Sequence, residues 1–171
     1  GEKTHLTLSF TDRTFQKADG KYNMPDGEVF GAPLDDKTEG QVYFDLPSLR
    51  SGNIVEGVTL EFSKGKVVKA SAKKGNKYLD AALNTDKGAK RLGEFAIGTN
   101  YGIKKPMLNT LFDEKIGGTI HMALGSAYQD KDGGGINKSA IHWDLVKSMT
   151  SKESKVLVNG KPILANGKLL V

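Results

Sequence analysis

The chain has 171 residues, 25 Lys and Arg against 20 Asp and Glu, a formal net charge of +5, and no cysteine. The lack of cysteine excludes disulfides, thiolate zinc sites, iron–sulfur clusters and cysteine nucleophiles. No apolar run approaches the ~20 residues that span a bilayer, so we expect no membrane partner. This length predicts a single domain, 1–171, with a core that needs no covalent staples. A signal-peptide pattern is absent and the sequence starts at Gly1, which suggests a processed chain or one cut from a longer protein.

The positive charge comes mainly from lysine, with 22 Lys against three Arg. Nucleic-acid-binding proteins usually rely on Arg for bidentate contacts, and aromatic residues for base stacking are not interleaved with the densest lysine cluster. We therefore interpret the lysines as a solvated outer coat and expect no nucleic-acid partner. The cluster consists of Lys64, Lys66, Lys69, Lys73, Lys74 and Lys77.

Alternating apolar and polar residues predict strands through the first half of the chain. Gly65 lies between the last two of these strands and can adopt a positive φ, which favours a hairpin. The predicted strands cover 5–10, 28–30, 40–46, 55–62 and 67–72.

The second half mixes helical and strand patterns. Leu79, Ala82 and Leu83 share one face of a helix predicted over 76–84. Thr85 or Asp86 then predicts the cap of a second short helix that runs through Arg91. The remaining predictions are strands over 92–97, 119–124 and 140–146, a short helix or irregular connection over 108–115, a Gly-rich loop over 125–137, and a terminal hairpin turning at Asn159-Gly160. These elements predict an α+β fold: strand-rich, with a largely antiparallel mixed sheet and a few short helices.

Two histidines lie in strand patterns that leave a polar face. His142 and Asp144 stand two residues apart, so both point to the face opposite the large apolar residues around them. Such a pair can bind one metal ion or two adjacent ions, or it can be a surface pair or a satisfied core pair. His121 shows the same alternation beside Ala123, although a lone strand histidine is usually structural. His5 has polar neighbours, and we interpret it as a surface residue.

Three glutamates complete a set of candidate nitrogen and oxygen ligands. Glu94 interrupts an apolar strand, where a charge is costly to bury unless it is paired or bound to metal. Glu28 follows a tight turn, and Glu114 precedes His121. Zinc, cobalt or manganese would suit such ligands. Six ligands exceed one tetrahedral site and favour two metals that share a bridging carboxylate.

Five blocks in order resemble the thermophilic-type metallo-aminopeptidases, the family of aminopeptidase T, aminopeptidase S and PepS. The blocks are 23–30 (NMPDGEVF), 91–95 (RLGEF), 109–114 (NTLFDE), 121–125 (HMALG) and 141–144 (IHWD). Their order and approximate spacing match the family across nearly all of the chain.

The resemblance implies a cytoplasmic exopeptidase that uses two divalent ions, zinc or cobalt, with manganese or magnesium as alternatives. It implies that Glu94 is shared between the metals and that Tyr128 stabilises the tetrahedral intermediate, which makes these two the catalytic candidates. The substrates would be peptides with a free N-terminus, cleaved by a metal-activated bridging water. The implied metal ligands are Glu28, Glu94, Glu114, His121, His142 and Asp144.

Family chains are about twice this length, and their first half is a separate α/β domain. The resemblance therefore implies that 1–171 is the C-terminal catalytic half, without the N-terminal domain, of an enzyme whose full-length relatives are homodimers. The connections near 97–108 and 129–138 are also of variable length in the family. Two other hypotheses stay open: a truncated, catalytically inert metal-binding domain, and a basic binding module for an acidic partner.

Overall fold

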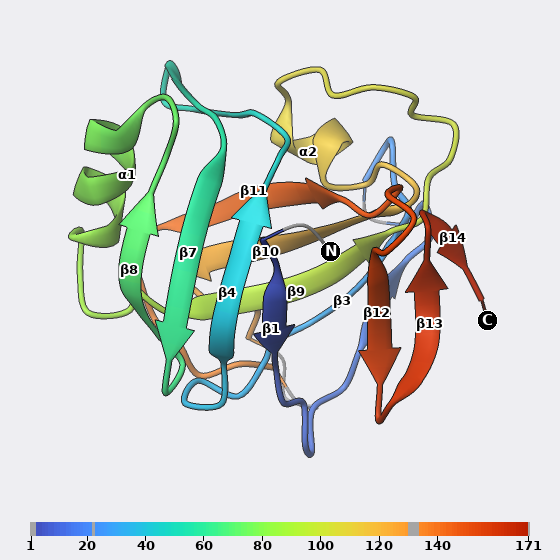
Figure 1. Cartoon of the computed structure of the whole chain (residues 1–171), viewed down its shortest axis with the longest axis horizontal. Helices are drawn as coiled ribbons and strands as arrows, with labels where there is room; N and C mark the ends of the chain where they lie inside the picture. Colours follow the sequence, from blue (N-terminus) through green and yellow to red (C-terminus); the bar gives the residue numbers. More distant parts are fainter. Residues whose placement is uncertain (1–2, 22, 130–133, 171) are drawn as a thin grey trace.

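The structure is a computed structural model that describes residues 3–21, 23–129 and 134–170. Within these ranges the chain forms four antiparallel sheets and two short helices (Figure 1). The prediction of a strand-rich, antiparallel fold is confirmed. The α+β class fits only loosely, because the helices are so short that the fold is mainly β.

Two larger sheets enclose the core. The first has the order β1-β4-β7-β8, and the second has the order β11-β10-β9-β3-β2. The strands of the first run across those of the second (Figure 1). The bounds are β1 His5–Thr7, β4 Glu39–Phe44, β7 Val58–Ser63 and β8 Lys66–Ser71 in the first sheet, and β2 Gln16–Ala18, β3 Glu28–Gly31, β9 Leu92–Gly98, β10 Thr119–Gly125 and β11 His142–Ser148 in the second.

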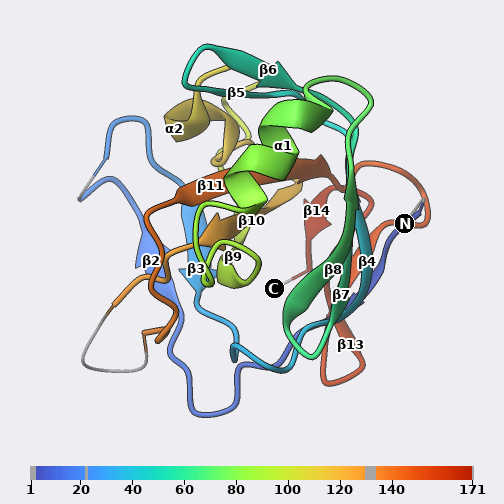
Figure 2. The same ribbon diagram turned by 90° about the vertical axis from the view of Figure 1, so that its left-hand side faces the viewer.

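Smaller elements close the ends of this sandwich. Helix α1, Asn76–Leu83, lies beside the edge of the first sheet, and its apolar face is buried as predicted (Figure 2). The other elements are β5 Ser48–Arg50, β6 Asn53–Val55, α2 Thr110–Asp113, β12 Lys155–Val158, β13 Lys161–Ala165 and β14 Lys168–Leu169.

The core lies between the inner faces of the two large sheets. Val42, Phe44 and Leu60 come from the first sheet and are fully buried. Met122 and Trp143 face them from the second sheet and are almost fully buried. Each of these strands therefore has one face in the core and leaves its other face for a different purpose.

Both predicted hairpin turns are confirmed. Lys64 and Gly65 have positive φ, as do Asn159 and Gly160, which is the pattern of a type I′ turn. The short strands β2, β5, β6 and β14 were not predicted, because two or three residues do not establish an alternation.

The prediction of a second helix through Arg91 is wrong. Residues 85–90 form bends and a turn, and Arg91 forms a β-bridge with Lys66. Asp86 accepts hydrogen bonds from the N–H groups of Gly88, Ala89 and Ala140. Its carboxylate therefore binds the chain before β11 to this segment, instead of capping a helix. The predicted Gly-rich loop has no strand or helix in its described part after Gly125, and 130–133 lie outside the described residues.

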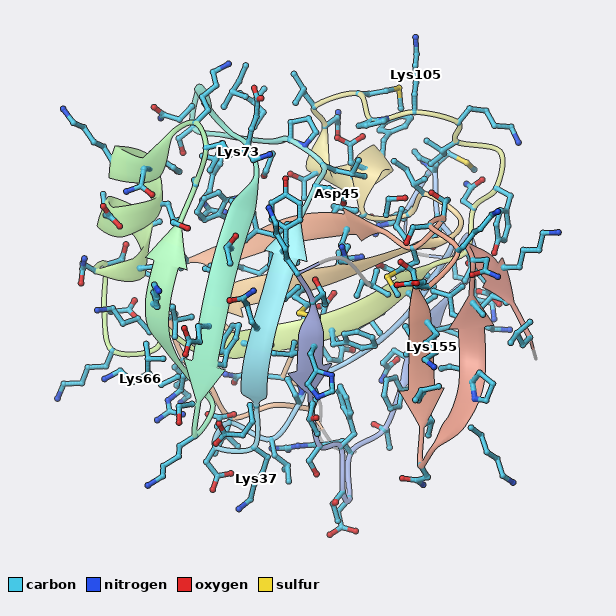
Figure 3. All side chains as sticks on the ribbon, in the orientation of Figure 1. Lys37, Asp45, Lys66, Lys73, Lys105 and Lys155 are labelled. Carbon is cyan, nitrogen blue, oxygen red and sulfur yellow. The ribbon has the colours of Figure 1, made fainter. Side chains whose placement is uncertain are left out.

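The lysines of the dense cluster are all exposed, as predicted. Lys37, Lys66 and Lys105 point away from the molecule (Figure 3). His5 is exposed too, in line with its prediction as a surface residue. No helix in the part of the chain that the structure describes has the length and apolar composition needed to cross a bilayer.

Candidate metal centre

The outer face of the second large sheet collects the predicted ligands. Glu94 on β9 pairs with Ala123 on β10, which pairs in turn with Asp144 on β11. Residues opposite each other on neighbouring strands share a face, so these three form one row across the sheet. His121 lies two residues along β10 from Ala123 and points the same way. The small Ala123 leaves space between the two carboxylates.

Glu28 reaches this face from the start of β3, where the backbone conformation of the preceding residue requires glycine. Gly27 has φ +130°, and a Cβ there would come within 2.9 Å of Asn100 Cβ. The amide of Asn100 donates to the Asp26 carbonyl over 2.9 Å, while its backbone N–H donates to the Lys115 carbonyl over 2.9 Å. Asn100 therefore links the start of β3 to the segment that follows α2.

His121 lies between two carboxylates. Its Nε2 is 3.2 Å from Glu28 Oε2 and 3.2 Å from Glu94 Oε1, and its side chain is fully buried. These three atoms converge from three adjacent strands. His121 therefore faces two buried acids, and its role as a metal ligand stays a prediction.

His142 and Asp144 share a face of β11, as the alternation predicts. Their Nε2 and Oδ1 atoms are 3.5 Å apart, with Asp144 buried and His142 at the rim. Nδ1 of His142 lies 2.8 Å from the Ser126 carbonyl oxygen, a contact that turns Nε2 toward Asp144. Trp143, on the opposite face, donates from Nε1 to Ser48 Oγ over 2.9 Å and fixes the strand against the core.

Glu114 enters from the end of α2. Within this short helix, Asp113 accepts the N–H groups of Met107 over 2.7 Å and of Asn109 over 3.2 Å. These bonds fold the segment before the helix against its last residue. Glu114 follows directly and lies beside His121 and Asp144.

The six predicted ligands form three overlapping groups, in each of which one ligand atom per residue lies within 4.8 Å of the others. Glu28, Glu94 and His121 form one group, which we call the first metal position of the candidate centre. Glu94, His142 and Asp144 form another, which we call the second metal position, so Glu94 belongs to both groups. The remaining group combines Glu114, His121 and Asp144. The structure thus brings all six residues together.

Unsatisfied buried atoms show that these residues fit divalent cations. Glu28 Oε2 and Asp144 Oδ1 are buried and accept no hydrogen bond of good geometry, although each faces an imidazole nitrogen. Buried carboxylate oxygens of this kind are costly unless a cation or donor satisfies them. Carboxylate oxygens and imidazole nitrogens are ligands for zinc, cobalt and manganese.

Charge and burial move the pKa values of the site groups. Burial alone would lower the pKa of His121, but its contacts with Glu28 and Glu94 raise it well above the ordinary value. The close contact with the Asp144 carboxylate raises the pKa of His142 to about 9. Burial works to raise the pKa of Asp144, yet the two histidines outweigh it and lower that pKa. Asp144 therefore stays ionised, and the imidazoles tend to hold protons that a metal would displace.

Lys115 is the site residue that the sequence did not reveal. Its side chain is fully buried, its Nζ lies 3.3 Å from Glu28 Oε1, and it forms a second ion pair with Glu114. Burial lowers its pKa and the Glu114 contact more than offsets this, so the pKa is raised. The one signal was its place directly after Glu114, and the expectation that lysines coat the outside hid it.

Tyr128 lies at the margin of the cluster, on the loop after β10. Its ring packs edge-on against Phe30, with 5.4 Å between centroids, and the residue is 40% exposed. Phe30 follows Glu28 by two residues on β3 and so shares its face. The predicted catalytic tyrosine is therefore beside the ligand face and open to solvent.

Comparisons with known proteins find relatives of this chain. Residues 1–169 match the family described as thermophilic metalloprotease (M29). Aminopeptidase 2 of Geobacillus stearothermophilus is 35% identical in an alignment of 167 residues, and the match covers 85% of this chain and 39% of that protein. Aminopeptidase T of Thermus thermophilus is 38% identical in an alignment of 136 residues, and that match covers 71% of this chain and 33% of that protein.

The fold is similar to that of a solved relative. The structure of wild-type AmpT from Thermus thermophilus aligns with all of this chain and 48% of its own, with a TM-score of 0.82 and 31% identity. The chain thus spans less than half the length of the relatives it matches. The family match covers nearly every residue, and the chain therefore belongs to the thermophilic metalloprotease (M29) family.

Proposed function

We propose that the chain is the catalytic domain of a metal-dependent aminopeptidase with a dinuclear site. The observation that carries the proposal is the position of Glu94, which belongs to both metal positions. A carboxylate shared between two positions is what a pair of ions bridged by one ligand requires. The relatives named above are aminopeptidases, which supports peptides with a free N-terminus as substrates.

Each ligand has a defined place in this proposal. Glu28 and His121 would hold one ion, His142 and Asp144 the other, and Glu94 would lie between them. Glu114 is the sixth proposed ligand and approaches from α2. When bound, two zinc or cobalt ions would lower the pKa of a water and polarise the peptide carbonyl, with manganese or magnesium as alternatives.

Tyr128 is the protein group that would stabilise the tetrahedral intermediate. Its phenol would donate a hydrogen bond to the oxygen that becomes negative when the peptide carbonyl is attacked. Its contact with Phe30 limits where the ring can lie, and its exposure leaves the hydroxyl accessible to a substrate.

The proposal extends to the whole protein. Because the chain spans 39% of aminopeptidase 2, we propose that 1–171 is the C-terminal domain of a longer enzyme. The family resemblance supports a homodimer in the cytoplasm for that enzyme.

Hydrolysis of aminoacyl chromogenic amides tests the activity. The purified chain with added Co²⁺ or Zn²⁺ should release the chromophore, and Glu94→Gln should reduce the rate to background because both positions lose a shared ligand. Glu61→Gln removes a carboxylate on β7, outside the site, and should retain the parental rate. Equal rates for the parent and Glu94→Gln would contradict the proposed site.

The second candidate is a metal-binding domain without turnover. It is favoured by the short span of the chain relative to its relatives, because further parts of those proteins can contribute to substrate binding. Zinc bound at two ions per chain, with no amide hydrolysis under any metal condition, would decide for this candidate.

A further inference from the structure

Lys115 places a buried positive charge on one side of the candidate metal centre. Its ammonium contacts Glu28 Oε1 over 3.3 Å and also pairs with Glu114, and its side chain is fully buried. Glu28 belongs to the first metal position. His142 and Asp144 belong to the second metal position. The charge of Lys115 also acts on Asp144, but its ion pairs are with Glu28 and Glu114.

The contact geometry makes Glu28 serve two cations at once. Its Oε1 faces Lys115, while its Oε2 lies 3.2 Å from His121 Nε2, where the ligand atoms of the first metal position converge. An ion there would share its carboxylate with a fixed ammonium group. Because the group is buried, neither solvent nor salt screens the repulsion between the two cations effectively.

The second metal position has a different electrostatic setting. Nδ1 of His142 contacts the Ser126 carbonyl, an arrangement that strengthens an imidazole ligand. Arg50 also approaches this side, but it donates to the backbone carbonyl of His142 at the exposed rim. Solvent screens a charge at the rim far more than one in the interior.

Resting on the proposed function, we propose that Lys115 makes the two metal positions unequal, so that the first binds its ion more weakly than the second. Lys115 is thus a positioning residue, because its ammonium group neutralises part of the negative charge of the carboxylate cluster. In the metal-free chain it offsets the repulsion among the buried carboxylates of Glu28, Glu94, Glu114 and Asp144. Removal of the Lys115 charge should therefore increase the metal affinity of the first position and lower the stability of the metal-free fold.

Isothermal titration calorimetry of the metal-stripped chain with Zn²⁺, in the presence of a competing chelator, measures both affinities. The parent should bind two Zn²⁺ with Kd values at least tenfold apart. In Lys115→Met, which keeps a long unbranched side chain without the charge, the weaker Kd should tighten at least tenfold. The stronger Kd should change less than threefold, and the melting temperature of the metal-free chain should fall.

Matched variants separate this effect from a loss of structure. Lys147 on β11 is also buried, at 4% exposure, and alternation places it with Leu145 on the core face, away from the ligands. Lys147→Met should leave both Kd values unchanged. Lys115→Arg keeps the charge, so the inequality should persist.

If Lys115→Met does not fold, as judged by circular dichroism, the same zinc titration of the parent and of Glu28→Gln tests the proposal. The weaker zinc-binding step should disappear in Glu28→Gln while the stronger step remains.

The outcomes distinguish this inference from the proposed function. Two equal Kd values in the parent, a weaker zinc-binding step that survives Glu28→Gln, or a weaker Kd that fails to tighten in folded Lys115→Met would overturn the role of Lys115 and leave a dinuclear site standing. A parent that binds no zinc would overturn the dinuclear site as well.

Discussion

His142 shows how one contact can set the chemistry of a residue. Its Nε2 lies 3.5 Å from Asp144 Oδ1, and this contact with a carboxylate raises the pKa of the imidazole to about 9. In the metal-free chain the imidazolium and the carboxylate form a pair. A metal at the same place must displace the proton, so metal binding releases it to solvent.

The raised pKa gives a prediction about pH. The folded pKa lies above the unfolded value of about 6.5, so the pair stabilises the metal-free chain fully below pH ~6.5. That stabilisation is lost as the pH rises through about 9. An NMR titration of the His142 ring in metal-free protein should have its midpoint near 9. In Asp144→Asn the midpoint should move down toward 6.5, and a parental midpoint already near 6.5 would disprove the pairing.

Strand β9 shows how an element holds a site through close backbone contact. A Cβ on Gly98 would lie 2.2 Å from the Ile116 carbonyl oxygen and 2.8 Å from Thr119 Oγ1. The segment before Ile116 carries Glu114 and Lys115, so this glycine lets the end of α2 approach the sheet.

Gly98→Ala should therefore destabilise the chain by about 1–3 kcal/mol, because the backbone at Ile116 must move. Urea unfolding of the metal-free protein measures the change. Gly102→Ala is the matched control: Gly102 is exposed and its nearest outside atom is Asn100 Oδ1 at 3.0 Å. The control should change the free energy of unfolding by less than about 0.5 kcal/mol. Equal values for the two variants would contradict the close contact.

The elements that carry the site could be predicted because their alternation is strong. The residues around His121 and His142 alternate large apolar and small or polar side chains, and that pattern separates the core face from the ligand face. The segment 85–91 had a helix signal, but the Asp86 carboxylate accepts hydrogen bonds from backbone N–H groups on two segments of the chain instead of capping a helix. Contacts of this kind join residues far apart in sequence, which local patterns do not report.

Lys115 marks the limit of prediction at the site itself. A lysine is rarely buried unless it is paired, and its two partners come from β3 and from its own neighbour Glu114. The order β11-β10-β9-β3-β2 creates that pairing, because it brings β3 beside β9 from a distant part of the chain. The family blocks contain the six residues that the structure brings together, whereas the internal cation depends on the sheet topology.

At the scale of the whole molecule, the candidate ligands link the sheet and α2 into one unit. They come from β3, β9, β10, β11 and the residue after α2, so bound ions would join segments that are otherwise held by backbone pairing and packing. Ions that bind only the folded chain add their binding free energy to its stability. The unfolded chain cannot hold the three ligands of a group within 4.8 Å of one another, so the difference between its zinc affinity and that of the folded chain should be large.

Zinc should therefore raise the melting temperature of the metal-stripped chain. One position at a free zinc concentration of a hundred times its Kd adds about 2.7 kcal/mol. For a chain of this size that corresponds to roughly 5–11 °C. Differential scanning calorimetry with and without Zn²⁺ measures the shift. Glu94→Gln, which weakens both positions, should lose most of it, and Glu61→Gln should retain it. A parental melting temperature that zinc leaves unchanged would mean that the cluster is held by its histidine–carboxylate pairs and binds no structural or catalytic metal.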